Sequence, residues 1–502
     1  MWNASTNMQA YTHYTPTGAA RLDRIYATEN ILNNKQGIET IAAAFTDHMA
    51  VLARINLLIP FIHRGRGRWS MNTSLLDDKQ FRDAIKMKWS EWKKHIRRYP
   101  SIVHWWDQYV KRNVKYMFIR EGTERKSDRN RMENFYYAAI YDIIQESVSY
   151  TQKIATLKKL RAKIIRLNGT FHQRTMLDTD EFDKTLGETP SLHHIIKSRK
   201  RQTSRTIRRI SDEHARIYST STGIRQAFKM HFNEKFKALQ TDVTKAQQPL
   251  NCELREIPVG SNETLEAPIT LSEIRSAIDK GKSHKAPGNG GIGLEFYKSE
   301  WETIKTDLLQ IFNSMYIDGT ILENQLKGII VCIHKHAHPV TIADYRPLTL
   351  MNTDYKILTR IIAVRLRQVL ADMIHPHQYC GIPGKSVFDA VADVRDAIAQ
   401  AEIFQKPLCI LSIDFSAAFD KISHEYLYMV LEAHGISASF RRKITRLYEH
   451  ATSEIQINGF RTDTIPIKSS IRQGCPLSMI LYVLSESSNT ILREKPQRHQ
   501  DM

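Results

Sequence analysis

The chain has 502 residues, a length that accommodates two to four domains of ordinary size. Its 42 % hydrophobic and 25 % charged residues exclude a fibrous protein and a wholly disordered one. The 72 lysine and arginine residues against 53 acidic ones give a formal net charge of +19. This excess favours a polyanionic partner, because each neutralised phosphate releases a condensed counterion, although a protein can also be basic without such a ligand.

No apolar run approaches the roughly 18 residues that a membrane span needs, and residues 1–18 lack the pattern of a secretory signal. We therefore expect a soluble, intracellular protein with no membrane partner. The cysteines are far apart and form no Cys-x-x-Cys pair, which predicts neither a disulfide scaffold nor a zinc site of cysteine pairs. A reducing compartment fits these five residues, Cys252, Cys332, Cys380, Cys409 and Cys475.

Residues 1–58 contain two stretches with strand-like alternation, 22–26 and 49–53. A segment this short with two strands does not bury a core by itself. We predict that it is the C-terminal part of a larger domain.

Residues 59–264 alternate basic clusters with helical patterns, and apolar residues recur every three or four positions over 154–167, which predicts an amphipathic helix. The run from Lys197 to Arg209 holds seven basic residues in thirteen. Such a run is a solvated helix face, a localisation signal or an arm that contacts phosphates. Its candidate nucleic-acid contacts are Lys197, Arg199, Lys200, Arg201, Arg205, Arg208 and Arg209.

From residue 265 helix and strand patterns alternate. A capping box at 270–273 begins a helix that ends at Gly281, and further helices are predicted at 355–370, 423–435 and from Leu477 onward. Ser386 and Asp389 cap another helix, which we expect to turn four apolar side chains inward: Ala390, Val391, Val394 and Ile398.

Two apolar runs, 328–333 and 408–413, predict buried strands. A third strand, 454–457, runs into Asn458-Gly459, a strong hairpin signal.

Asp414 stands where the second apolar run ends. A carboxylate at the end of a strand can hold a divalent cation against a substrate phosphate, as nucleotidyl transfer requires. The alternative is an aspartate that caps a helix. Residues 472–478 add a glycine turn with an amide side chain that could lie against a nucleotide, or that is only a turn between strand and helix.

Taken in order, four segments resemble the fingers and palm of the reverse transcriptases of non-LTR (LINE-type) retrotransposons. They are Lys285-Ala-Pro-Gly288, Asp344-Tyr-Arg-Pro347 with Leu350-Met-Asn352, Leu411 to Asp420, and Arg472 to Ser478. The resemblance covers about residues 265–502.

By this resemblance Asp414 would be the first metal-binding aspartate, with the carbonyl of Ile413 beside it and Mg²⁺ or Mn²⁺ as the cofactor. Phe419 would be the steric gate that excludes a ribose 2′-hydroxyl, or else an aromatic ring packed beneath Asp420. Arg346 would bind the incoming triphosphate, a task that suits a planar bidentate donor.

The alternative for Arg346 is a salt bridge to Asp344. Gln473 and Gly474 would contact the nucleotide and the template.

The chain departs from the family pattern at Asn289-Gly290-Gly291, Met479 and Tyr482. No pair of adjacent aspartates, the mark of the family's third palm motif, follows residue 478. We therefore expect a truncated, inactive fragment of the polymerase.

At the N-terminus, residues 21–26 and Thr46-Asp47-His48 resemble the last motifs of the apurinic/apyrimidinic-type endonuclease of these elements. By that resemblance His48 would act at the scissile phosphate, Asp23 would orient His48, and Asp47 would lie near the metal. The upstream metal ligands of that fold are absent from the sequence.

The expected fold class is α+β. Residues 1–58 would be the remnant of an endonuclease/exonuclease/phosphatase-type β-sandwich, 59–264 a basic helical linker, and 265–502 the fingers and partial palm. The resemblance implies an RNA-directed DNA polymerase with an RNA template, target DNA and dNTPs as partners, in the nucleus and cytoplasm. The alternatives are a nucleic-acid-binding protein without catalysis and a maturase-like scaffold.

Overall fold

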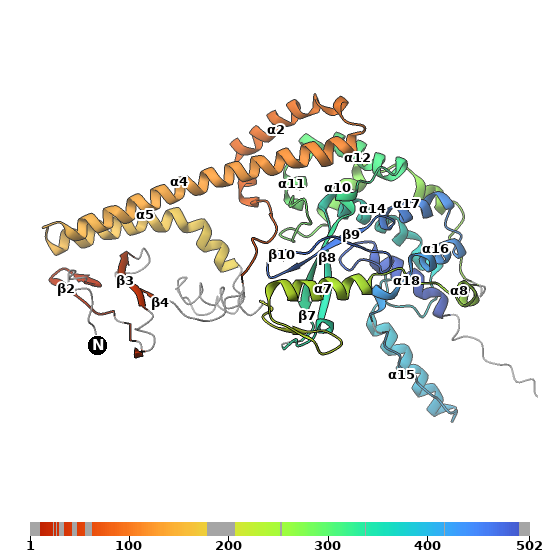
Figure 1. Cartoon of the computed structure of the whole chain (residues 1–502). Helices are drawn as coiled ribbons and strands as arrows, with labels where there is room; N and C mark the ends of the chain where they lie inside the picture. Colours follow the sequence, from red (N-terminus) through yellow and green to blue (C-terminus); the bar gives the residue numbers. More distant parts are fainter. Residues whose placement is uncertain are drawn as a thin grey trace, which may run out of the picture. The chain divides into compact units, whose positions relative to one another are not determined.

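The computed structural model describes residues 11–23, 25–26, 28–29, 35–42, 48–55, 63–177, 206–250, 254–336, 338–415 and 417–490. The chain divides into two compact units. Unit 1 comprises Met1–Ile62 and Arg120–Thr206, and unit 2 comprises His63–Ile119 and Ile207–Met502. The protein is of mixed α and β structure, mostly helical, with small sheets (Figure 1).

Unit 1 contains two antiparallel strand pairs. Strand β1 (His13–Thr15) pairs with β2 (Gly18–Ala20), and β3 (Lys35–Ala42) pairs with β4 (Met49–Ile55). The strand predicted over 49–53 is thus confirmed. The strand predicted over 22–26 was wrong, because the backbone N–H groups of Leu22 and Asp23 donate to the Thr12 hydroxyl instead of to a neighbouring strand.

The rest of the described part of unit 1 belongs to two long helices, the first of which begins in unit 2. Helices α4 (Lys111–Gln145) and α5 (Tyr150–Leu177) run side by side (Figure 1). Ile140, Leu157 and Ile164 form a small core with Met49, whereas Ile165 is exposed. This one-sided burial confirms the amphipathic helix predicted over 154–167.

The sheet of unit 2 is built around β7 (Gly328–His334). It pairs antiparallel with β8 (Tyr345–Leu350), Val331 facing Leu348, and parallel with β9 (Thr452–Ile457), Ile330 facing Ile455. The short strands β10 (Phe460–Arg461) and β11 (Ile465–Pro466) pair with β9. Two of the three predicted strands are therefore present.

The predicted hairpin follows β9. Asn458 and Gly459 both have positive φ, 50° and 79°, as a two-residue hairpin turn requires. Helix α7 (Ser221–Lys235) covers one face of the sheet, where Phe228 and Phe232 share a core with Ile330 and Ile455.

The other core of unit 2 surrounds the long helix α14 (Thr353–Met373), which includes the whole of the predicted helix 355–370. The capping box predicted at Thr270 and Glu273 is present at the start of α10 (Leu271–Asp279). The remaining helices of unit 2 are α2 (Lys79–Lys93), α3 (Ile102–His104), α8 (Val243–Leu250), α9 (Ser261–Glu266), α11 (Leu294–Ser299), α12 (Trp301–Asn313), α13 (Glu323–Leu326), α16 (His424–Ala433), α17 (Ala438–Tyr448) and α18 (Ser478–Thr490).

Short elements complete the described part of unit 2: a strand pair, β5 (Ile210–Ser211) with β6 (Ile217–Tyr218), and several short 3-10 or π turns. The turns are Thr73–Asp77, Ile96–Arg98, Trp105–Val110, Ser314–Asp318, Ile342–Asp344 and Ala418–Lys421.

Part of the predicted linker belongs to this core. Trp89, Trp105 and Trp106 are buried among the helices of residues 265–484. The indole N–H of Trp89 donates to Asp307 Oδ2 at 2.8 Å, and that of Trp106 donates to Asp354 Oδ2 at 3.0 Å. Residues 63–119, which lie within the predicted linker, are therefore a structural component of the unit that contains the reverse-transcriptase-like segments.

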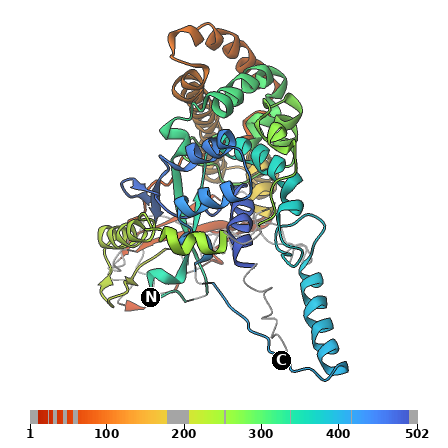
Figure 2. The same cartoon turned by 90° about the vertical axis from the view of Figure 1, so that its right-hand side faces the viewer.

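Helix α15 (Val387–Ile403) has the predicted capping box of Ser386 and Asp389, but the inward orientation was wrong. The side chains of Val391, Val394 and Ile398 are exposed, and the helix projects from the rest of unit 2 (Figures 1 and 2). The apolar pattern is correct for an amphipathic helix, but none of the residues of this helix is buried.

The strand predicted over 408–413 was also wrong. Residues 406–415 form no strand, and Leu411 and Ile413 are 80 % and 62 % exposed. An apolar run becomes a strand only where a neighbouring strand binds its backbone, and no described strand lies beside this one. Among the described helices, none is both long and apolar enough to cross a membrane.

Candidate functional site

Three of the four segments singled out in the sequence meet in unit 2, together with the last residues of the fourth, Phe419 and Asp420. A Cβ on Gly288 would lie 2.4 Å from the carbonyl carbon of Met351, so only glycine permits this approach. The N–H of Gly290 donates to Asn352 Oδ1 at 2.8 Å. The N–H of Thr349 donates to the carbonyl of Gln473 at 2.9 Å. Segments far apart in the sequence therefore converge on the end of β8.

The backbone conformation at residue 474 requires a glycine. Its φ is +103°, and an added Cβ would lie 2.8 Å from the carbonyl oxygen of Thr349. The close approach of the loop 472–475 to β8 accounts for a glycine here.

The buried guanidinium of Arg472 anchors the same loop. It donates to the carbonyls of Leu326 (2.6 Å) and Leu447 (2.9 Å) and to the hydroxyl of Tyr355 (2.5 Å). The guanidinium also stacks on the rings of Tyr355 and Tyr448, at 4.7 and 5.6 Å. These contacts of the buried Arg472 side chain fix the position of the loop 472–475, a role that the sequence alone did not indicate.

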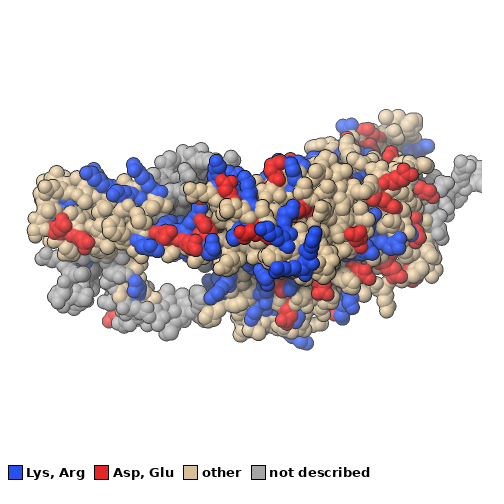
Figure 3. Space-filling model, turned by 90° about the horizontal axis from the view of Figure 1, so that it is seen from above, with Lys and Arg blue, Asp and Glu red and all other residues tan. Residues whose placement is uncertain are grey.

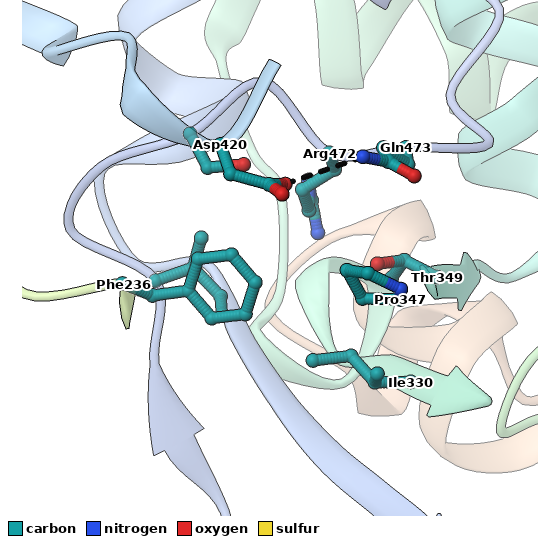
Figure 4. A pocket seen from close by; sticks show the side chains of 9 residues that line it. Phe236, Ile330, Pro347, Thr349, Asp420, Arg472 and Gln473 are labelled. Carbon is teal, nitrogen blue, oxygen red and sulfur yellow. Dashed lines mark hydrogen bonds between the residues drawn. The ribbon is translucent and has the colours of Figure 1, made fainter. Parts of the chain in front are cut away.

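Beyond this anchor, Gln473 and Asp420 face one another across a small pocket that Phe236, Ile330, Pro347 and Thr349 also line (Figure 4). Gln473 Nε2 lies 3.4 Å from Asp420 Oδ1. The other carboxylate oxygen of Asp420 accepts from Lys235 Nζ at 2.9 Å. Lys235 stands at the end of α7, outside the four segments, and sequence reasoning missed it because nothing in its neighbourhood indicates a partner so distant in the chain.

Phe419 precedes Asp420 and stacks on Tyr482 of α18, with ring centroids 4.6 Å apart and planes at 22°. The backbone carbonyl of Phe419 accepts from the N–H of Ile471. Its ring thus has a partner other than Asp420, and the Phe419 backbone is tied to the residue before Arg472.

Arg346 lies on β8 with an exposed side chain. The expected alternative, a salt bridge to Asp344, is not formed in the described structure. The backbone N–H groups of Thr341 and Val340 donate to Asp344 and hold the pKa of that carboxyl well below its usual value, and His336 adds a contact at 3.1 Å. The Asp344 carboxylate is engaged within its own loop, so the Arg346 guanidinium faces solvent.

Asp414 is not brought to the pocket. It lies in the exposed segment 406–415, and the pocket beside Gln473 is lined by Asp420. Across the described ranges, no three His, Cys, Asp or Glu side chains gather in a way that could hold a metal ion. Asp420 does not fit a ligand role, because its two oxygens face Lys235 and Gln473.

Unit 1 brings two predicted residues together. His48 Nδ1 lies 2.6 Å from Asp23 Oδ2, and this hydrogen bond lowers the pKa of the Asp23 carboxyl, helped by one from Thr12. The ring of His13 lies 4.5 Å from that of His48. Asp47 lies outside the described residues.

Most of the predicted basic run also lies outside the described residues, namely Lys197, Arg199, Lys200, Arg201 and Arg205. Arg208 and Arg209 are described and exposed. On the face seen in Figure 3, Lys and Arg side chains are spread over the surface among Asp and Glu. The distribution of charge therefore does not by itself mark a binding site for a polyanion on this face.

The family model described as reverse transcriptase (RNA-dependent DNA polymerase) matches residues 333–496. This range contains Arg346, Asp414, Phe419 and the Gln473–Gly474 turn.

Similar proteins cover more of the chain than the family model does. The transposon TX1 uncharacterized 149 kDa protein of Xenopus laevis is 26 % identical over 93 % of this chain and 36 % of its own length. The probable RNA-directed DNA polymerase from transposon X-element of Drosophila melanogaster is 23 % identical over 65 % of this chain and 36 % of its own length. The RNA-directed DNA polymerase from mobile element jockey of Drosophila funebris is 24 % identical over 52 % of this chain and 29 % of its own length.

The chain thus spans about a third of the length of these relatives. Two of the three converging segments, 344–352 and 472–478, lie within the residues that the family model matches. Residues 333–496 are thus similar to the reverse transcriptase family, and the chain is similar in sequence to proteins of transposons and mobile elements.

Proposed function

We propose that this chain acts in RNA-templated DNA synthesis, as part of the polymerase of a LINE-type retrotransposon. The observation that carries this proposal is the convergence of the segments around Gly288, Met351 and Gln473. The ligands of this polymerase would be an RNA template, a DNA primer and deoxynucleoside triphosphates.

Three residues have roles in this proposal. The exposed guanidinium of Arg346 would bind the triphosphate. Phe419, supported by the ring of Tyr482, would exclude a 2′-hydroxyl. Gln473, which lies beside Asp420, would contact the nucleotide.

Polymerases of this family use a divalent metal, whose charge stabilises the phosphates that react. Asp414, with the Ile413 carbonyl, is the candidate ligand by resemblance. One carboxylate in an exposed segment does not make a metal site, so the described residues alone do not fit a divalent metal ion.

A second function, nucleic-acid binding without catalysis, is favoured by one observation. The segment of Asp414 is exposed, whereas the pocket beside Gln473 is lined by Asp420. In this case the domain would hold RNA or DNA and transfer no nucleotide.

For residues 1–58 we propose a remnant of an apurinic/apyrimidinic-type endonuclease. The 2.6 Å contact of His48 with Asp23 supports this, because a carboxylate fixes the tautomer of the imidazole that it binds. Asp47 would be near its metal by resemblance only.

Primer extension by the full chain tests the first function against the second. A labelled DNA primer annealed to RNA is incubated with dNTPs in Mg²⁺ or Mn²⁺, with Asp414→Asn as the control. Extension that Asp414→Asn abolishes supports the polymerase. Stable binding of the primed template without extension selects the second function, and absence of both contradicts the whole proposal.

A further inference from the structure

A second cavity, of about 360 Å³, borders the loop 472–475 at Gly474. Its charged lining consists of cations only, and Gly474 forms part of its wall. The cations are Lys280, Lys282, Lys285, Lys356 and Arg360. We call this the cation pocket.

Two elements supply these side chains. Lys280, Lys282 and Lys285 belong to the loop between α10 and α11, and Lys356 and Arg360 lie one turn apart on α14. Arg360 Nη1 donates to the carbonyl of Ala277 at 2.7 Å, which fixes its guanidinium at the end of α10. A Cβ on Gly281 would lie 2.9 Å from this Nη1, so a glycine in the loop makes room for the arginine.

The arrangement is electrostatically unfavourable without an anion. Burial lowers the pKa of Lys356, and the charges of Arg360 and Arg68 lower it further. Like charges four residues apart on a helix destabilise it. The carboxylate of Glu295 is nearby, but it accepts the backbone N–H of His284. Within the described parts of the chain, none of the five cations forms an ion pair with a carboxylate.

The position of the cation pocket points to its ligand. Gly474 borders it, and the neighbouring residue Gln473 lines the pocket of Asp420 (Figure 4). An anion here would therefore lie directly beside the proposed nucleotide. Five cations distributed over two elements suit a row of singly charged phosphates better than one compact ion.

We propose that the cation pocket binds consecutive phosphates of a single-stranded polynucleotide, in line with the proposed function, on which this inference rests. The triphosphate of a single nucleotide offers the same chemistry, and the experiment separates the two sources. The pocket would hold the strand in place beside Gln473 without reading its sequence, because phosphates carry no base information.

The test uses the full chain with Lys282→Ala, Lys285→Ala and Lys356→Ala combined. The matched control removes three cations elsewhere, by Lys86→Ala, Lys88→Ala and Lys305→Ala. These are surface lysines, each paired with a nearby carboxylate. Affinity for a fluorescent single-stranded oligoribonucleotide is measured by anisotropy at several salt concentrations. A parallel titration measures the affinity for a fluorescent deoxynucleoside triphosphate.

If all three lysines contact phosphates, the slope of log K against log salt flattens by about 2, from roughly 0.7 per contact. The control variant should keep the slope of the wild type. The double variant Lys282→Ala, Lys285→Ala removes only exposed side chains, so it tests the same idea without risk to the fold, with an expected flattening of about 1.4.

A slope that equals the control's overturns the inference, and a loss confined to the nucleotide assigns the pocket to the triphosphate instead. The proposed function fails separately, when the wild type neither extends a primer nor binds the primed template. A wild type that binds RNA with a pocket-dependent slope but fails to extend leaves this inference standing.

Discussion

The ammonium group of Lys235 lies 2.9 Å from the carboxylate of Asp420. The first residue ends a helix that precedes the reverse transcriptase match, and the second lies within the match. The Asp420 side chain is only 5 % exposed, so its charge has little access to water. This pair makes α7 a structural partner of the pocket that contains Gln473.

Replacing Lys235 by methionine should therefore destabilise unit 2. A buried carboxylate that loses its cation costs about 3 kcal/mol, and Lys235→Arg should recover most of this. The midpoint of urea unfolding measures the change. A double variant, Lys235→Met with Asp420→Asn, should be more stable than Lys235→Met alone, and an equal loss in both would contradict an electrostatic role.

A second buried pair gives a pH-dependent prediction. Lys111 Nζ lies 2.7 Å from Asp107 and 2.5 Å from Asp354. Burial alone would raise the pKa of Asp354, but the charge of Lys111 and hydrogen bonds from Lys111, Trp106 and Gln325 lower it overall.

A carboxyl whose pKa is lower in the folded state stabilises the fold above its unfolded pKa of about 3.9, and this contribution is lost as pH falls through the folded pKa. Asp354→Asn should thus be less stable than the wild type at pH 6, and the difference should shrink below about pH 4. Unfolding by urea at several pH values checks this. A difference that is constant from pH 6 to pH 3 would show that the Asp354 charge does not matter.

Gly474 should not tolerate a side chain. Gly474→Ala combines a φ of +103° with a Cβ 2.8 Å from the Thr349 carbonyl oxygen, which together cost about 1–3 kcal/mol. The matched control is Gly122→Ala in α4, where no atom lies within 4 Å of the new Cβ and alanine should stabilise the helix by about 1 kcal/mol. Thermal unfolding of both variants tests the contrast. Equal effects would refute the backbone argument.

The stack of Phe419 on Tyr482 gives a test of nucleotide selection. If Phe419 excludes a 2′-hydroxyl, Phe419→Ala should bring ribonucleotide and deoxynucleotide affinities close together. Tyr482→Phe keeps the ring beneath Phe419 and should keep the preference. Competition between dNTP and rNTP for binding to the full chain with a primed template measures this preference. If Phe419→Ala prefers dNTP over rNTP as strongly as the wild type does, Phe419 is not the residue that excludes the 2′-hydroxyl.

Local signals in the sequence predicted local structure well. Thr270 with Glu273, and Ser386 with Asp389, are capping boxes in the structure, and Asn458-Gly459 forms the hairpin turn. Each depends on residues within four positions of one another, which a single sequence shows directly.

Long-range contacts were less predictable. The apolar run 408–413 was expected to be a buried strand, but burial depends on a partner that the run itself does not specify. The partners of Arg472, such as Leu326 and Leu447, and the contact of Lys235 with Asp420 arise only when distant segments fold together. Three of the four motif segments lie within the residues 333–496 that the family model matches, whereas the side chains that support them were missed.

We propose that residues 333–496 contain a polymerase site that selects the nucleotide. The most direct test is the stability of the complex between the full chain and an RNA template whose DNA primer ends in a dideoxynucleotide, which permits binding but no bond formation. The account predicts that the next complementary dNTP slows dissociation of this complex at least tenfold, that non-complementary dNTPs do not, and that Arg346→Ala weakens the effect. Dissociation rates that are the same with all four dNTPs would contradict it.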